Sequence, residues 1–259
     1  MADRLQSKTV VITGAGSGIG AGIARGLADE GANVVLVDLD LEAAAAVASQ
    51  IEKDGGQALA ARADVSSRDQ VRAAIAAAVE RFGRIDAFFN NAGLNKPMKY
   101  LDITEENFEL LMKINGLGVL IGTQEAAKQF IAQGGGGKVV NTASIAGRQG
   151  FPSFAPYSAT KAAVISLTQS GARALAADGI TVNAFAPGVV DTPLWTALDR
   201  DLEAIGEGDS GFDSMAGDIL LGRAALPEDI IPTAIFLAAA DSDYITGQVI
   251  PIEGGMILI

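Results

Sequence analysis

The sequence has no cysteine and no histidine among its 259 residues. The lack of cysteine excludes disulfides, thiol nucleophiles and zinc sites with thiolate ligands. The lack of histidine excludes a Ser-His-Asp triad and the imidazole base that many enzymes use. Proton transfer must therefore rely on tyrosine, lysine, aspartate or glutamate, and we expect no metal site.

Basic residues and long apolar runs are also scarce. Lys and Arg number 19 against 31 Asp and Glu, which gives a net charge of −12. A protein that binds nucleic acid through its phosphates needs the opposite sign. No apolar run approaches the roughly 18 residues of a membrane-spanning helix, and the charged start at Met1–Arg4 does not resemble a signal peptide. We therefore expect a cytoplasmic protein with neither nucleic acid nor membrane as a partner, and the absence of cysteine fits a reducing compartment.

Short runs rich in Val and Ile alternate along the chain with longer, Ala-rich segments of helical spacing. Continuous apolar strands separated by helices are typical of a parallel sheet covered on both faces. We therefore predict an α/β protein, a single-domain Rossmann-like doubly wound sheet of about seven strands that occupies residues 1–259. The predicted strands are 8–13, 33–37, 57–63, 85–89, 138–143, 180–186 and 248–252, and the predicted helices are 19–30, 41–53, 67–82, 104–133, 157–177 and 227–240.

A glycine-rich turn, Thr13-Gly14-Ala15-Gly16-Ser17-Gly18-Ile19-Gly20, joins the first predicted strand to the first helix. Glycines in this position let the backbone approach a pyrophosphate at the helix N-terminus. The spacing from Gly14 is G-x-x-x-G-x-G rather than the better-known G-x-G-x-x-G. The turn therefore predicts a dinucleotide site, with a tight turn that binds no ligand as the alternative.

Asp38 ends the second predicted strand, where an acid meets the adenosine ribose in dinucleotide-binding folds. Its carboxylate would accept hydrogen bonds from a free 2′-hydroxyl and repel a 2′-phosphate. The neighbouring Leu39 and Ser17 carry no charge to attract a phosphate. This pattern favours NAD over NADP, although Asp38 could also be a simple capping residue.

Tyr157 and Lys161 are four residues apart and share one face of a predicted helix, with Pro156 just ahead of it. A nearby ammonium favours the ionised form of a phenol, so we expect Lys161 to lower the pKa of Tyr157 towards neutral pH. A half-buried tyrosine beside a surface lysine is the alternative for this pair alone.

These motifs, in this order, resemble the short-chain dehydrogenase/reductase family from Lys8 to Gly255. The resemblance rests on the glycine turn and on further pieces along the chain: Asp64-Val65, Asn90-Asn91-Ala92-Gly93, Asn115, Ser144, Tyr157-Ser158-Ala159-Thr160-Lys161, Pro187-Gly188 and Thr246-Gly247-Gln248. It implies NAD-dependent transfer of a hydride between a secondary alcohol and its ketone, with Tyr157 as the general acid or base. A thioester reductase of the 3-oxoacyl type, using NADP, and a nucleotide-binding protein without activity remain as alternatives.

The resemblance also assigns roles to individual residues. Ser144 would bind the substrate oxygen, Lys161 would hold the nicotinamide ribose, and the side chain or backbone of Asn115 would hold a water that links Lys161 to solvent. The implied cofactor site comprises Gly14, Ser17, Gly18, Ile19, Asp38, Leu39, Asp64, Val65, Asn91, Ala92, Gly93, Tyr157, Lys161, Pro187, Gly188, Val190 and Thr192.

The region around Pro187–Trp195 is most similar to polyol (sorbitol) and 2,3-butanediol dehydrogenases. Residues 191–226, with their scattered glycines, would form a lid over the substrate. The substrate residues implied are Ser144, Ile145, Phe151, Phe154, Tyr157 and Trp195, although Trp195 and the phenylalanines could equally be core residues. Because Ile145 and Phe151 stand where polyol enzymes tend to be polar, the class of alcohol stays open between a polyol, a vicinal diol and a bulkier secondary alcohol. Asn95, Arg148 and Gln149 are the polar residues that could contact it.

We expect a homotetramer, partly from the resemblance. The apolar end of the sequence, Met256–Ile259, favours burial against a partner or in the core. Gly116, Gly118 and Gly122 interrupt the helix predicted at 104–133, and small residues there would let helices of two subunits approach closely.

Overall fold

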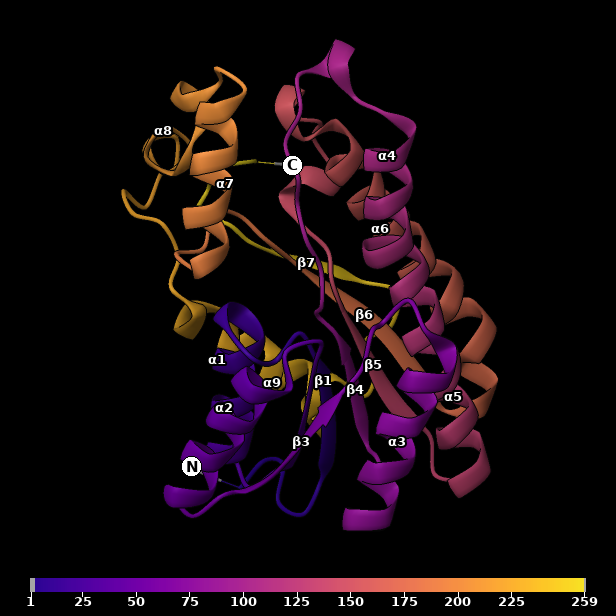
Figure 1. Cartoon of the computed structure of the whole chain (residues 1–259). Helices are drawn as coiled ribbons and strands as arrows, with labels where there is room; N and C mark the ends of the chain where they lie inside the picture. The colour runs from indigo at the N-terminus through magenta and orange to yellow at the C-terminus, as the bar shows by residue number, and fades with distance from the viewer. Residues whose placement is uncertain (1–2, 259) are drawn as a thin grey trace.

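Seven strands form one parallel sheet in the computed structural model, which describes residues 3–258. The strand order is β3-β2-β1-β4-β5-β6-β7 (Figure 1). The strands are β1 Thr9–Thr13, β2 Asn33–Asp38, β3 Gln57–Arg62, β4 Ala87–Asn90, β5 Gly137–Thr142, β6 Ile180–Pro187 and β7 Val249–Ile252. This confirms the predicted doubly wound sheet, with strand ends shifted by one or two residues. Because the order reverses between β1 and β4, a crevice opens there at the carboxyl ends of the strands.

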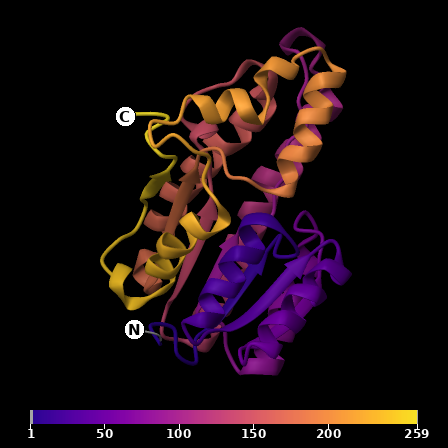
Figure 2. The same cartoon turned by 90° about the vertical axis from the view of Figure 1, so that its left-hand side faces the viewer.

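Helices cover both faces of the sheet (Figures 1 and 2). Val10 and Ile12 of β1 pack towards one helical layer, whereas Val11 between them packs towards the other. Successive strand residues point to opposite faces, so a strand buried on both faces is apolar throughout. The first layer contains α1 Gly18–Asp29, α2 Leu41–Lys53 and α9 Pro227–Ala238; the second contains α3 Arg68–Phe82, α4 Glu105–Leu111, α5 Gly118–Gln133 and α6 Ala155–Leu175.

The long helix predicted at 104–133 is present as an unbroken helical stretch from Glu105 to Gln133, in which a π-helical turn at Met112–Leu117 joins α4 to α5. The wide turn contains Asn115, whose side chain is completely buried. Such turns often occur at functional sites. Here the turn puts Asn115 beside the segment that follows β4.

The glycines of this region serve the chain's own packing. A Cβ on Gly118 would lie 2.9 Å from the Val65 side chain, and one on Gly122 would overlap the Asn90 side chain. The predicted reason for these two glycines, close approach of helices from two subunits, is therefore wrong. Gly116 has room, since a Cβ there would meet only the flexible end of Met112 at 3.5 Å.

Residues 191–226 contain two helices that the sequence reading missed, α7 Pro193–Ala204 and α8 Phe212–Gly217. Trp195 of α7 and Phe212 of α8 meet edge to face, with ring centroids 5.6 Å apart. Val190, just before the segment, pairs with Ala225, near its end, as an isolated bridge. Figure 2 shows these helices beyond the carboxyl ends of the strands. Leu198 and Leu202, buried four residues apart, are the helical signal that was available in the sequence.

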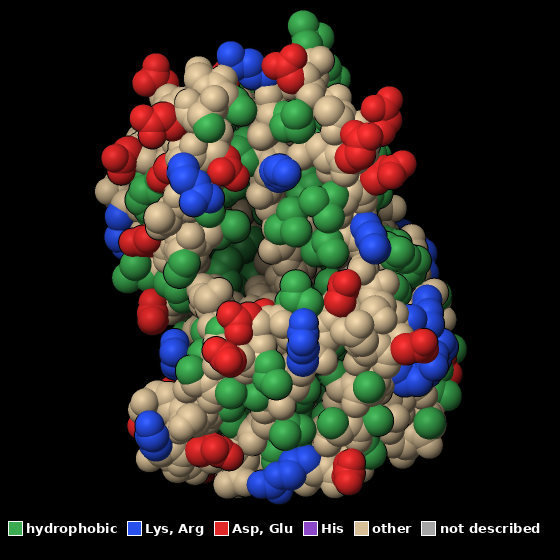
Figure 3. All heavy atoms as spheres, in the orientation of Figure 1, with side chains coloured by type: hydrophobic (Ala, Val, Ile, Leu, Met, Phe, Trp, Pro, Cys, Tyr) green, Lys and Arg blue, Asp and Glu red, His purple; other side chains and the backbone are tan. Residues whose placement is uncertain are grey.

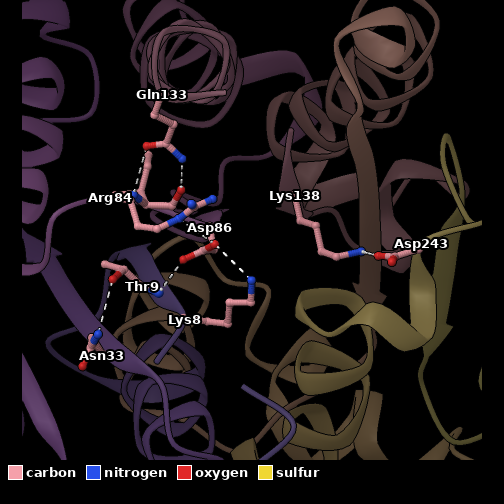
Figure 4. A network of polar contacts seen from close by, with 9 residues as sticks. Lys8, Thr9, Asn33, Arg84, Asp86, Gln133, Lys138 and Asp243 are labelled. Atoms are coloured by element: carbon pink, nitrogen blue, oxygen red, sulfur yellow. Dashed lines mark hydrogen bonds and ion pairs between the residues drawn. The ribbon is translucent and has the colours of Figure 1, made fainter. Parts of the chain in front are cut away.

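A polar network holds the opposite, amino-terminal edge of the sheet (Figure 4). Asp86, just before β4, accepts hydrogen bonds from the Thr9 amide (3.0 Å), the Arg84 guanidinium (3.0 Å) and the Lys8 ammonium (3.3 Å). Lys138 of β5 pairs with Asp243 at 2.7 Å. These polar contacts therefore stabilise the amino-terminal edge of the sheet, at the opposite end of the strands from the crevice.

Met1, Ala2 and Ile259, which belong to the predicted charged start and apolar tail, lie outside the described residues. Within residues 3–258 no helix is long and apolar enough to cross a bilayer. The same residues contain no group of three or more acidic side chains placed to hold a metal ion.

Candidate active site

Two hollows meet at the carboxyl edge of the sheet. One is a groove of about 1450 Å³ that runs along the glycine turn and the ends of β2 and β4. The other is a cavity open to solvent, about 680 Å³ including its mouth, which is lined by the loop after β5, the start of α6 and the lid helices. Figure 3 shows a recess with apolar walls near the middle of this face. Tyr157 lines both hollows and therefore stands at their junction.

The glycine turn leaves room for a ligand along its backbone. Gly14 and Gly18 have left-handed backbones, with φ of 65° and 51°, which only glycine adopts without strain. A Cβ on Gly14 would lie 2.7 Å from the Ala92 backbone, and one on Gly20 would overlap the Gly14 carbonyl. Ser17 starts α1 without capping it through its side chain, so the first amides of the helix are available to an anion. The turn thus fits the pyrophosphate of a dinucleotide.

Asn91 fixes this turn to β4. Its Nδ2 donates to the Thr13 and Gly14 carbonyls at 3.0 and 3.1 Å, and its Oδ1 accepts from the Thr142 hydroxyl at 3.2 Å. Asn91 therefore lines the groove as predicted, but its side chain is already committed to the protein.

Asp38 is oriented at the far end of the groove. One carboxylate oxygen accepts from the Gly16 amide at 2.8 Å and the other from the Asp40 amide at 3.0 Å. The sequence reading missed Arg62, which stands opposite Asp38 on β3 and lines a shallow pocket with it. Asp40 and Glu42 line the same pocket, so carboxylates outnumber the one guanidinium there.

The proposed catalytic residues converge on the junction of the two hollows. Helix α6 begins at Ala155, two residues before Tyr157. Lys161, only 4% exposed, donates from Nζ to the Thr142 carbonyl at 2.7 Å. The same Nζ lies 5.5 Å from the centre of the Tyr157 ring. Ser144 lines the cavity beside Tyr157, and its Oγ accepts from the Ala146 amide at 3.1 Å.

Each polar atom of the Asn115 side chain is already bonded to the protein. Its Nδ2 donates to the Leu94 carbonyl at 2.8 Å and to the Thr160 hydroxyl at 3.2 Å, while its Oδ1 accepts from the Leu94 amide at 2.9 Å. An amide oxygen can accept two hydrogen bonds, so the second lone pair of Oδ1, as well as the backbone, could still serve the predicted water. The side chain also holds the segment after β4 against the π turn.

The expectation that Lys161 lowers the pKa of Tyr157 is wrong for the protein without cofactor. Burial raises the pKa of the Tyr157 phenol, and the neighbouring Ser144 hydroxyl offsets only part of the rise. Burial also lowers the pKa of the Lys161 ammonium from 10.5 to about 8. Both pKa values are thus shifted in the direction that favours the neutral form, because burial penalises either charge.

The lowered pKa predicts that stability depends on pH. Between about pH 8 and 10.5 the unfolded chain keeps a proton that buried Lys161 has lost, so the free energy of unfolding should rise with pH across that window. From about pH 7 to about pH 9.5 the expected gain is about 2 kcal/mol. Urea unfolding of the free protein at both pH values, at one protein concentration, measures the gain.

The Lys161→Met variant is the control for this prediction. It lacks the titrating group, so its stability should change by about 2 kcal/mol less than that of the native chain over the same pH range. The same pH dependence in both proteins would show that other groups cause it.

The structure gathers nearly all predicted site residues around the two hollows. The groove is lined by Gly14, Ser17, Gly18, Ile19, Asp38, Leu39, Asp64, Val65, Asn91, Ala92, Gly93, Tyr157, Lys161 and Thr192. The cavity is lined by the predicted substrate residues Ser144, Ile145, Phe151, Phe154, Tyr157 and Trp195, and also by Pro187, Gly188 and Val190, which were assigned to the cofactor.

Other placements differ from the sequence reading. Arg148 is turned away, with its guanidinium donating to the Val249 carbonyl at 2.8 Å, and Gln149 is exposed outside the cavity. Asn95 does line the cavity. The sequence reading missed lining residues such as Leu94, Ile114, Leu198 and Met215, because nothing in their local pattern separates them from core residues.

Comparison with known proteins agrees with this arrangement. The family model described as short chain dehydrogenase matches residues 8–203. The chain is 42% identical to a diacetyl reductase [(S)-acetoin forming] of Staphylococcus epidermidis over 97% of this chain and 99% of the relative. It is 40% identical to the L-2,3-butanediol dehydrogenase of Corynebacterium glutamicum, again over 97% and 99%, and 42% identical to a sorbitol dehydrogenase of Cereibacter sphaeroides over 97% and 98%.

A solved structure gives the same result. A short-chain type dehydrogenase/reductase from Mycobacterium marinum superposes with a TM-score of 0.90 at 35% identity, covering 98% of this chain and 97% of the other. The match of the family model, the relatives of nearly equal length and the shared fold all lead to one conclusion. The chain belongs to the short-chain dehydrogenase family.

Proposed function

We propose that the protein transfers a hydride between NAD and a small secondary alcohol, with vicinal diols and hydroxyketones as its preferred substrates. As a member of this family, it is an oxidoreductase that interconverts alcohols and ketones. One observation carries the proposal: Tyr157 stands where the groove that fits a dinucleotide meets an apolar cavity.

The chain's own residues account for the proton. Tyr157 takes the hydroxyl proton as the alcohol is oxidised and returns it when a ketone is reduced. Ser144 donates a hydrogen bond to the reacting oxygen from the same cavity wall. Lys161 lies one helical turn further on and would hold the ribose next to the ring. The cofactor, when bound, supplies or accepts the hydride.

NAD is the proposed cofactor because of the charge at the adenosine end of the groove. Asp38 is held by two backbone amides and faces the groove. The adjoining pocket holds three carboxylates, Asp38, Asp40 and Glu42, against the single guanidinium of Arg62. A 2′-phosphate would meet net repulsion there, whereas a free 2′-hydroxyl can donate to a carboxylate.

Replacing two residues at this end should move the preference towards NADP. We expect the native protein to favour NAD by about a hundredfold in kcat/KM, since one charge contact of about 3 kcal/mol corresponds to that ratio. The double variant Asp38→Ser, Leu39→Arg loses the nearest of the three carboxylates and gains a cation at a position that is 62% exposed. Steady-state kinetics with both cofactors measures the ratio, and a native preference for NADP would contradict the assignment.

The cavity supports small substrates with few hydroxyls. Ile145, Phe151, Phe154 and Trp195 contribute apolar walls, and few polar side chains face the space. A sugar alcohol would leave several hydroxyls without partners there. Relatives named as diacetyl reductase and L-2,3-butanediol dehydrogenase fit this reading better than the one named as sorbitol dehydrogenase.

A substrate panel tests the proposal. Small alcohols, vicinal diols, polyols and the corresponding ketones are offered with NAD or NADH, and the absorbance of the reduced cofactor is followed. Turnover should be most efficient with the diols and hydroxyketones. No turnover with any of them would contradict the proposed function.

Three further parts of the proposal concern the whole molecule. Residues 1–259 act as one domain, in which 191–226 form the lid, and the protein works in the cytoplasm. It assembles as a homotetramer. Leu220 and Leu221 support the last part: they are 71% and 77% exposed in the single chain and lie against Gly255 and Gly254, close in sequence to Leu258, which is 80% exposed. Neighbouring exposed apolar side chains of this kind mark contact surfaces. A monomer mass in light scattering would contradict the tetramer.

A further inference from the structure

The apolar cavity contains one polar side chain that the proposed chemistry leaves unused. Asn95 lines the cavity together with Ser144 and Tyr157. Its Oδ1 is buried and has no hydrogen-bond partner among residues 3–258. Buried side-chain oxygens without a partner are rare, and each calls for a specific explanation. The oxygen itself is turned away from the open space, but Asn95 lies on the cavity wall. A rotation of its amide would let a bound molecule provide the missing partner.

The backbone on both sides of Asn95 is held in place. The amide and carbonyl of Leu94 both bond to the Asn115 side chain, at 2.9 and 2.8 Å. The carbonyl of Lys96 accepts from Asn107 Nδ2 at 3.2 Å. Two buried asparagines therefore fix the residues immediately before and after Asn95, as expected of a site that is organised before its ligand arrives.

The segment is also tied to the opposite part of the cavity wall. The Met98 amide donates to the Ser153 carbonyl at 3.1 Å, and Ser153 lies between Phe151 and Phe154. Asn95 thus occupies a set position relative to these two rings. A polar group on this apolar wall favours a substrate that carries a second oxygen in addition to the reacting oxygen.

We propose that Asn95 binds the second oxygen of the substrate, the one on the carbon next to the reacting carbon. This deepens the proposed function and depends on it. The amide suits both oxidation states, because Oδ1 accepts from a hydroxyl and Nδ2 donates to a carbonyl. Ser144 and Tyr157 hold the reacting oxygen, while Asn95 distinguishes a vicinal diol, hydroxyketone or diketone from a simple alcohol or ketone of the same length.

The test compares substrates that differ only in that second oxygen. The ratio of kcat/KM for 2,3-butanediol to kcat/KM for 2-butanol is measured with NAD in the native protein and in three variants. In Asn95→Leu the ratio should fall about ten- to hundredfold, mainly through KM of the diol, because a buried polar partner is lost. In Asn95→Asp the ratio should be kept, because a carboxylate still accepts from a hydroxyl.

The reverse reaction separates the two halves of the amide. With 2,3-butanedione against 2-butanone, Asn95→Asp should lose the preference, since an ionised carboxylate cannot donate to a carbonyl. Gln149→Leu removes an exposed amide outside the cavity and should leave both ratios unchanged.

The outcomes separate this proposal from the proposed function. An unchanged ratio in Asn95→Leu, or an equal loss on both substrates, would show that Asn95 is structural only. If the native protein turns over neither the diol nor the simple alcohol with either nicotinamide cofactor, both proposals are wrong.

Discussion

Replacing Tyr157 by phenylalanine should lower kcat by about a thousandfold while the affinity for NAD stays nearly the same. The change removes the phenolic oxygen, the group proposed to exchange the proton, and general acid–base catalysis contributes about 10²- to 10⁴-fold. The ring itself, with Lys161 Nζ 5.5 Å from its centre, is kept. Steady-state kinetics gives kcat, and a cofactor titration followed by the fluorescence of the single tryptophan, Trp195 in the cavity wall, gives the affinity.

Tyr100→Phe is the matched control. Tyr100 lies in a short 3-10 turn and is 69% exposed, so losing its hydroxyl should leave kcat unchanged. Near-native turnover in Tyr157→Phe would contradict the assignment of the general acid or base. A parallel loss of NAD affinity would mean that the variant disturbs the groove and that the loss of kcat has another cause.

Gly122→Ala should destabilise the fold by about 2 kcal/mol, although alanine normally stabilises a helix interior by about 1 kcal/mol relative to glycine. The added methyl would overlap the Asn90 side chain and lie 2.8 Å from the Phe88 ring. Asn90 cannot move freely, since its Nδ2 donates to Thr123 at 3.1 Å and to Asn141 at 2.9 Å in the core. Overpacking of about 1–3 kcal/mol and a strained buried hydrogen bond of about 1 kcal/mol outweigh the helical gain.

Gly116→Ala provides the comparison for this variant. It makes the same chemical change in the neighbouring turn, where the new methyl meets only Met112 at 3.5 Å. Its stability should equal or slightly exceed that of the native chain. Urea unfolding followed by circular dichroism, at one protein concentration for all three proteins, measures both changes. A Gly122→Ala variant as stable as Gly116→Ala would refute the packing argument.

Strands, caps and the glycine turn could be predicted because their causes are local. The four central residues of Asn33–Asp38 are buried and all apolar. Asp40 caps α2 by accepting hydrogen bonds from the amides of Glu42 and Ala43. The left-handed backbone conformations of Gly14 and Gly18 likewise depend on the local sequence of the glycine turn. The order of such elements, together with the family motifs, led to the prediction of a dinucleotide site at the glycine turn and of Tyr157 as the general acid or base.

What could not be predicted depends on contacts between distant parts of the chain. The π turn contains Asn115, whose side chain bonds to the backbone of Leu94, 21 residues earlier in the chain, and these bonds favour the turn. The pKa of Tyr157 is raised because the folded chain buries the phenol. The spacing of residues along the sequence does not reveal that burial. Arg62 faces Asp38 only through the register of β2 and β3, and Asn95 stands out only once its missing partner is visible.

The packing of the chain's end on the lid has a practical consequence for handling the protein. The Leu221 amide in the lid region donates to the Gly254 carbonyl at 3.0 Å, and a Cβ on Gly255 would lie 3.0 Å from Leu220. At the start of the chain, Arg4 is bound instead to Glu30 behind α1, near the amino-terminal edge of the sheet (Figure 1). An affinity tag or surface attachment is therefore best placed ahead of Arg4, because a fusion at the other end would load the segment that packs against Leu220 and Leu221 of the lid region.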